Sequence, residues 1–250
     1  MIRIQLCGQF AVVVDDQRVD AALPGRRGRL LVAYLAAHRN QATDRGALID
    51  VLWPDAAPDS AAASLTVLLS KIRAVLAPAE IRGRTSVQLV LPPEAVIDAE
   101  TALAGLHEAE SAVAQCQWPR AWAQALTAQF VARRRFLPEF EAPWVEQGRA
   151  EIDLVYERAL GCYGEACLGI GDAELPGAER AARRLIVQAP LSETGYRLLM
   201  RVLAARGETA AALGVYDQLR RALRDELGVE PAVGSRDLYR RLLGTRTAPT

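Results

Sequence analysis

Apolar and polar residues alternate at the very start of the chain, and a period of two predicts a β-strand. Every second side chain is apolar in residues 2–6, and a second apolar run covers residues 10–14. The acidic pair at residues 15–16 predicts a turn before a third short strand at residues 17–19. Residues 2–20 are therefore predicted to form short strands.

Apolar residues then recur every three to four positions, which predicts helices. The first helix covers residues 26–38. The second follows Thr43 or Asp44, either of which can cap its N-terminus, and it ends before Pro54.

A third helix and the hairpin after it form the most informative part of the chain. The helix is predicted at residues 59–76, with Asp59 as its N-cap, and the hairpin at residues 81–91. Four apolar side chains fall within about 60° of arc on the helix, namely Leu65, Leu69, Ile72 and Leu76. The opposite side carries small or hydroxylated residues beside a single lysine, namely Ser60, Ala63, Ser64, Val67, Ser70 and Lys71.

Beyond Pro92-Pro93 the pattern predicts helices and no further strand. The predicted helices cover residues 98–115, 120–135, 142–170, 176–188, 192–206, 209–227 and 235–243. Gly171-Asp172 and Gly207-Glu208 lie 36 residues apart, close to the period of about 34 residues in tetratricopeptide repeats. We therefore predict a mainly α protein. An N-terminal α+β winged helix-turn-helix domain at residues 1–95 precedes an all-α, tetratricopeptide-like repeat domain at residues 96–250.

Charge and composition exclude several classes of protein. The formal net charge of the 250 residues is +0, and residues 1–100 carry 11 basic and 11 acidic side chains. Any contact with nucleic acid must therefore come from a local patch. No apolar run approaches the roughly 18–20 residues that span a bilayer, and the N-terminus lacks the basic start and apolar core of an export signal. We expect a cytoplasmic protein without a membrane partner, with four reduced and buried cysteines.

Catalytic chemistry finds no support in the sequence. His38 and His107 are far apart, and neither has a Cys, Asp or Glu at metal-ligand spacing. The motifs of serine hydrolases, zinc proteases and dinucleotide-binding enzymes are missing. We therefore expect no enzymatic activity, no metal and no cofactor.

The third helix has the side chains needed to enter the DNA major groove, which is about 12 Å wide, because small residues let its backbone approach the base edges. An ordinary amphipathic surface helix remains the alternative for this segment taken alone. The candidate DNA-reading residues on this helix are Ser60, Ser64, Thr66, Val67, Leu68, Ser70, Lys71 and Arg73. The hairpin, as a wing, and the start of the first helix provide candidate backbone contacts, namely Arg82, Arg84, Thr85, Arg26 and Arg27. Solvated surface charge is the alternative for these arginines.

In this order, the segments resemble the SARP type of bacterial transcription activator, an OmpR-like winged helix followed by a bacterial transcriptional activator domain. The resemblance covers about residues 2–243. It rests on Gly25-Arg26-Arg27, the run LIDVLWP at 48–54, residues 64–76, Phe136-Leu137-Pro138, Pro143-Trp144-Val145, Tyr216-Asp217 and the run ELGVEP at 226–231. It implies binding of double-stranded DNA at promoter direct repeats, by two protomers side by side. It also implies contact with RNA polymerase through the loop residues Pro54, Asp55, Pro58 and Asp59.

Two features depart from that family pattern. Val67 and Leu68 can touch thymine methyl groups but cannot make the bidentate hydrogen bonds that read guanine or adenine. The wing has Ser86-Val87 where the family often has Gly-Tyr. The alternative function is therefore a protein-interaction module, in which a degenerate winged helix accompanies a partner-binding repeat groove. A small-molecule sensor is a third hypothesis.

Overall fold

The structure, a computed structural model, describes residues 1–244, and these residues form two compact units. The first unit combines Met1–Leu103 with Phe130–Asp153, and the second combines Ala104–Gln129 with the residues from Leu154 onward. Each unit is thus built from two separate segments of the chain, whereas each predicted domain is one continuous segment. The predicted boundary after residue 95 concerns the extent of a DNA-binding domain and stays a prediction. Residues 245–250 of the predicted second domain lie outside the described residues.

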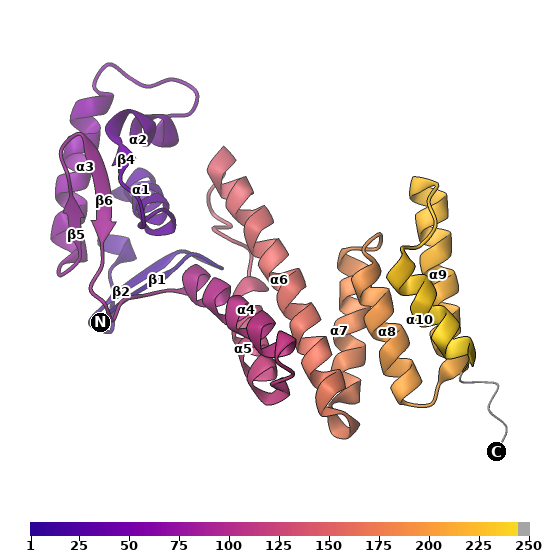
Figure 1. The fold of residues 1–250 in the computed structure, drawn as a ribbon. Coiled ribbons are helices and arrows are strands. Elements are labelled where there is room, and N and C mark those ends of the chain that lie inside the picture. Colours follow the sequence, from indigo (N-terminus) through magenta and orange to yellow (C-terminus); the bar gives the residue numbers. More distant parts are fainter. Residues whose placement is uncertain (245–250) are drawn as a thin grey trace. The chain divides into compact units, whose positions relative to one another are not determined.

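The first unit begins with a four-stranded sheet in the order β3-β2-β1-β7. Its strands β1 and β2 are labelled in Figure 1. β1 (Ile2–Gln5) pairs antiparallel with β2 (Ala11–Val14), which pairs with β3 (Gln17–Arg18). Asp15 and Asp16 have left-handed φ angles of 48° and 61°, as a tight hairpin turn requires, so the predicted turn is confirmed. A short 3-10 turn, Asp20–Ala22, follows.

The fourth strand corrects the expectation that no strand follows Pro92-Pro93. β7 (Val96–Ile97) pairs in parallel with β1, with Arg3 opposite Val96 and Ile4 opposite Ile97. A strand of two residues is too short to show an alternating pattern, and its partner β1 lies more than 90 residues earlier in the sequence. Local pattern therefore could not predict this strand.

Three helices and a second sheet complete the α+β part of the first unit. The helices are α1 (Gly25–Ala37), α2 (Arg45–Leu52) and α3 (Ala61–Leu76), and the sheet order is β4 (Thr43–Asp44), β6 (Ser86–Val90), β5 (Glu80–Arg82). The carboxylate of Asp44 accepts a hydrogen bond from Gly46 N at 2.7 Å, so Asp44 is the cap of α2. Asp59 is not the cap of α3, because a turn in which Ala61 N bonds Pro58 O at 2.8 Å delays the helix start.

The apolar stripe of α3 is buried as predicted. Leu65 and Ile72 are 0% exposed, and Leu69 and Leu76 are 1% exposed. α3 contacts α1, α2 and β5 along this stripe. Each such side chain contributes about 1.5–3 kcal/mol through its removal from water, so the stripe fixes which face of α3 remains outside.

Residues 130–153 also belong to the first unit, which the sequence pattern did not indicate. Phe136 forms an antiparallel bridge with Cys7, and Leu137 N donates to Leu6 O at 2.8 Å. The guanidinium of Arg149, a residue that is 7% exposed, donates to carbonyl oxygens of residues 136, 137 and 140. The segment is thereby tied to the end of β1.

Helices form the rest of the chain. They are α4 (Asp98–Ala114), α5 (Trp118–Ala132), α6 (Pro143–Ile170), the 3-10 turn η2 (Asp172–Glu174), α7 (Leu175–Gln188), α8 (Glu193–Ala205), α9 (Thr209–Leu227) and α10 (Val233–Gly244). α4, α5 and α6 contribute residues to both units. Their bounds lie within a few residues of the predicted ones.

The later helices of the second unit pack as successive antiparallel neighbours, α7 on α8 and α8 on α9 (Figure 1). Small residues at their contacts, such as Ala178 and Ala212, are 0% exposed and let the helices approach closely. Gly171 and Gly207 have φ angles of +81° and +79°, a backbone region that favours glycine. The predicted fold class, an α+β start followed by helical repeats, is confirmed.

Two further expectations can be compared with the described residues. Cys7, Cys162 and Cys167 are buried, but Cys116 is exposed, so the expectation of four buried thiols was wrong for Cys116. It follows the end of α4 with a φ of +54°, at a turn where burial is not available. No helix within residues 1–244 is both long enough and apolar enough to span a bilayer.

Candidate functional site

The outer face of α3 carries most of the predicted reading residues. The exposed positions are Ser60, Thr66, Val67, Ser70, Lys71 and Arg73, and the partly buried ones are Ser64 and Leu68. Val67 is 53% exposed, so its isopropyl group is open to solvent. The buried stripe on the opposite side of the helix is what holds this face outward.

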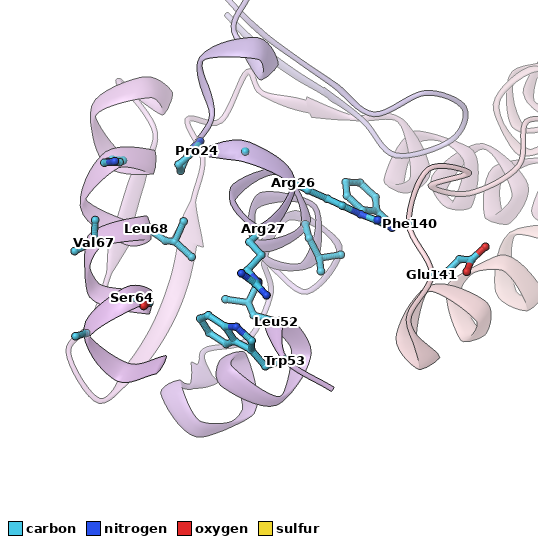
Figure 2. A pocket seen from close by; sticks show the side chains of 14 residues that line it. Pro24, Arg26, Arg27, Leu52, Trp53, Ser64, Val67, Leu68, Phe140 and Glu141 are labelled. Atoms are coloured by element: carbon cyan, nitrogen blue, oxygen red, sulfur yellow. The ribbon is translucent and has the colours of Figure 1, made fainter. Parts of the chain in front are cut away.

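An open groove of about 800 Å³ lies beside this face, within the first unit. Its walls come from the start of α1, the end of α2, α3 and two residues before α6 (Figure 2). The lining residues are Pro24, Gly25, Arg26, Arg27, Leu30, Leu52, Trp53, Ala63, Ser64, Val67, Leu68, Lys71, Phe140 and Glu141. Six predicted site residues from two helices are therefore brought together here.

The groove has apolar walls and a positive balance of charge. Three cationic side chains line it, Arg26, Arg27 and Lys71, against one carboxylate, Glu141. The chain as a whole has a formal net charge of +0, so this is the kind of local patch that contact with an anion requires. The first N–H groups of α1 lie at the same place and favour negative charge.

Trp53 is a member of the groove that sequence reasoning missed. The pattern indicated only that it belongs to the apolar side of the second helix. In the structure the guanidinium of Arg27 lies over its ring, 5.0 Å from the centroid (Figure 2). Such a cation–π contact contributes about 0.5–1 kcal/mol at an exposed site and restricts the arginine. The two residues are 26 positions apart in sequence, so no spacing rule could pair them.

Arg26 is held on the other side of α1. Its Nη2 donates to the backbone oxygen of Glu139 at 3.3 Å, and its side chain runs toward Phe140 (Figure 2). The Glu139 carboxylate in turn accepts from Phe10 N at 2.9 Å. Arg26 is thus oriented by the segment that returns to the first unit.

Besides Arg26 and Arg27, three more predicted DNA-contacting side chains, those of Thr66, Arg73 and Arg82, have partners within the chain. The hydroxyl of Thr66 donates to Ala62 O at 2.9 Å and accepts from Arg45 Nη2 at 2.6 Å. Arg73 Nε donates to Ile81 O at 3.0 Å, which ties α3 to β5.

Arg82 Nε donates to Glu80 at 2.7 Å. That hydrogen bond lowers the pKa of the Glu80 carboxyl. Together with the contacts of Thr66 and Arg73, it supports the shape of the helix and hairpin.

The tip of the hairpin contains Gly83, Arg84 and Thr85, all exposed. Gly83 has a φ of +96°, and a Cβ at this position would lie 1.8 Å from Ser86 O. Only glycine fits, so the tight turn fixes where the two following side chains leave the backbone. Thr85 O also accepts from Arg45 N at 3.1 Å.

The remaining predicted site is the segment between α2 and α3. Its four named residues, Pro54, Asp55, Pro58 and Asp59, are all exposed. They do not line the groove.

Comparison with a family model identifies the second half of the chain. Residues 97–243 match the model described as the bacterial transcriptional activator domain. The match covers more than half of the 250 residues.

Curated relatives match nearly the whole length of the chain. It is 29% identical over 258 residues to the regulatory protein AfsR of Streptomyces coelicolor, covering 97% of this chain and 24% of AfsR. It is 26% identical over 253 residues to the transcriptional regulatory protein EmbR of Mycobacterium tuberculosis, covering 95% of this chain and 62% of EmbR. The chain thus spans a quarter of AfsR and under two thirds of EmbR.

A solved structure supports the fold. It contains Mycobacterium tuberculosis EmbR in complex with a low affinity phosphopeptide, and it matches with a TM-score of 0.85 and 22% identity. The match covers 100% of this chain and 66% of that chain.

Proposed function

Because the chain belongs to the family of the bacterial transcriptional activator domain, we propose that it regulates transcription by binding double-stranded promoter DNA. The family and the relatives named above are transcriptional regulators and not enzymes. The predicted resemblance to SARP-type regulators is confirmed at this level.

The groove beside α3 carries the proposal. Arg27 from the start of α1 and Lys71 from α3 line the same depression as the small and apolar side chains of α3. If α3 enters the major groove, the start of α1 meets the adjacent phosphates, where its N–H groups and arginines are suited to bind. The surface therefore offers base contacts and backbone contacts at once, without a basic domain.

Within this proposal the side chains have different roles. Ser64, Val67, Ser70 and Lys71 face the bases, and Arg26, Arg27, Arg84 and Thr85 face phosphates. Ser60 stands at the start of the reading face. Leu68, Thr66, Arg73 and Arg82 hold α3 and the wing in position through the burial and hydrogen bonds described above. All of these residues lie within residues 1–95, the predicted DNA-binding domain.

We extend the proposal to the setting in which such a regulator acts. Two protomers occupy direct repeats side by side, in the cytoplasm, and activate transcription. The exposed segment with Pro54, Asp55, Pro58 and Asp59 touches RNA polymerase. This segment does not line the DNA-facing groove, so it stays accessible to another protein when DNA is bound there.

The test is fluorescence polarisation with duplex fragments from the gene's own upstream region, titrated with salt. The variant carries Lys71→Ala and Arg84→Ala, and the matched control carries Arg220→Ala and Arg221→Ala on α9, so both lose two positive charges. Loss of the phosphate contact of Arg84 should reduce the slope of log K against log salt by about 1. Together with loss of the base contact of Lys71, it should weaken binding at least tenfold. The control should bind like wild type.

Each component of the proposal has its own refutation. Saturable binding that the double change leaves intact contradicts the assigned site. Absence of binding to every promoter fragment contradicts DNA binding itself. In that case a stable protein partner, captured without DNA, supports the alternative function as a protein-interaction module. The exposed Val67 and the neutral net charge are the observations that favour this alternative.

A further inference from the structure

We infer that Val67 makes the chain select thymine, by packing its side chain against the C5-methyl group of that base in the major groove. This inference rests on the proposed function and deepens it, because it names the base that the reading face recognises. The argument has three parts: the position of Val67 on α3, its rigidity, and the chemistry of base edges.

Val67 is the most prominent side chain on the outer ridge of α3. At 100° per residue, Ala63, Val67, Ser70 and Ala74 lie within about 60° of arc, and all four are exposed. Its neighbours on the ridge have one side-chain carbon, with a hydroxyl in the case of Ser70. The isopropyl group of Val67 therefore extends furthest and meets a base edge first.

Val67 cannot easily turn away from that contact. The turn of α3 that bears it is anchored from below by Leu65 and Leu69, which are 0% and 1% exposed. A valine in a helix also has one strongly preferred χ1 rotamer. Both the helix face and the side chain are therefore set before any DNA is bound.

Leu68 is excluded from the same role. Both residues line the groove, but Leu68 is partly buried and its side chain is directed toward Arg27 and Trp53, whereas Val67 is exposed on the other side of α3 (Figure 2). The sequence pattern treated Val67 and Leu68 together as apolar readers, and the structure separates them. Val67 points outward, while the side chain of Leu68 is used in packing.

The chemistry of the major groove then leaves thymine as the favoured partner. Every base edge there presents donors and acceptors, and the methyl group of thymine is the apolar exception. Valine against a polar edge removes water from that edge and offers no hydrogen bond in return, which is unfavourable. Valine against the methyl group buries apolar surface on both sides. Ser70 and Lys71 provide the polar contacts at neighbouring positions.

The experiment removes the methyl group from the DNA and the isopropyl group from the protein. The strongest site is located by footprinting, and each thymine in it is replaced in turn by deoxyuridine, which keeps every hydrogen-bonding group. Affinities are measured by polarisation for the full chain, for Val67→Ala and for a matched control. The control is Val187→Ala, since Val187 is 75% exposed on α7, which belongs to the second unit.

Replacement at one or two positions should weaken binding by wild type and by the Val187→Ala control about three- to fivefold, the effect of one buried methyl group. The same replacement should leave binding by Val67→Ala unchanged. Circular dichroism should match wild type, because alanine is the stronger helix former.

Two results overturn the inference while leaving DNA binding intact. One is that deoxyuridine is tolerated at every position by wild type. The other is that Val67→Ala loses as much affinity on replacement as wild type does. Absence of any sequence-preferring binding instead overturns the proposed function, and the inference falls with it.

Discussion

Replacement of Arg149 by methionine should destabilise the first unit more than any exposed arginine change would. Arg149 Nε donates to Phe136 O at 3.1 Å, and Nη2 donates to Leu137 O at 3.0 Å and Phe140 O at 2.8 Å. Nη1 bonds the carboxylate of Glu146. One side chain thus satisfies three carbonyl groups of the returning segment.

The magnitude follows from those bonds. A hydrogen bond from a charged donor contributes about 1.5–3 kcal/mol, and methionine keeps the apolar stem while supplying no donor. Some of the freed carbonyl groups will reach water as the segment moves, so the loss should be smaller than the sum of three such bonds, about 3–5 kcal/mol. For a chain of this size that lowers the melting temperature by about 6–20 °C.

Arg158→Met on the same helix is the control. Arg158 makes two hydrogen bonds of 2.8 Å to Glu110, but its side chain is 47% exposed. Its loss should cost no more than about 1 kcal/mol. Thermal melts compare the two variants, and hydrogen exchange should show lost protection of Leu137 N and Phe140 N in Arg149→Met alone. Equal melting temperatures for the two variants would refute the assigned role of Arg149.

Three further outcomes are expected. Gly83→Ala should distort the hairpin tip, because its Cβ would lie 1.8 Å from Ser86 O. The variant should bind DNA severalfold more weakly, while hydrogen exchange in α3 stays as slow as in wild type. Unchanged affinity would show that the hairpin is not part of the DNA interface. Native protein should react with a thiol reagent at Cys116, which is exposed, and at Cys7 only on unfolding, because burial raises the pKa of the Cys7 thiol to about 12; peptide mapping decides. Since the Cys7 thiol ionises near pH 9 once unfolded, its contribution to stability is complete below pH 9 and is lost as pH rises toward 12. Urea midpoints should therefore fall less steeply above pH 9 in Cys7→Ala, and parallel curves would contradict this linkage.

The parts that local pattern could predict are those in which one helix turn or one strand pair determines the result. The stripe of Leu65 and Leu69 repeats at helical spacing, so both the burial of α3 and the identity of its outer face followed from sequence. Asp44 was one of two predicted caps because a short acceptor before an apolar run satisfies the first N–H groups. In each case the causes lie within a few residues.

The parts that could not be predicted depend on residues distant in sequence. Trp53 enters the groove only because the first and second helices pack so that Arg27 covers its ring. Arg73 and Arg82 looked free for DNA, yet each has an acceptor on β5. The return of the segment with Arg149 has no periodic signal, because its irregular backbone is held by hydrogen bonds to a single buried guanidinium.

The alternation of the two units along the chain has a consequence for how a ribosome would produce it. The first unit cannot finish folding when residue 103 has emerged, because Phe136, Phe140 and Arg149 are still missing. By the time those residues appear, the first piece of the second unit, Ala104–Gln129, is already outside and waits for the residues from Leu154 onward. Each unit therefore completes its folding only after part of the other unit has been synthesised. A fragment that ends at residue 95 would lack residues that belong to the first unit. For expression, the shortest piece that contains a whole first unit ends at Asp153.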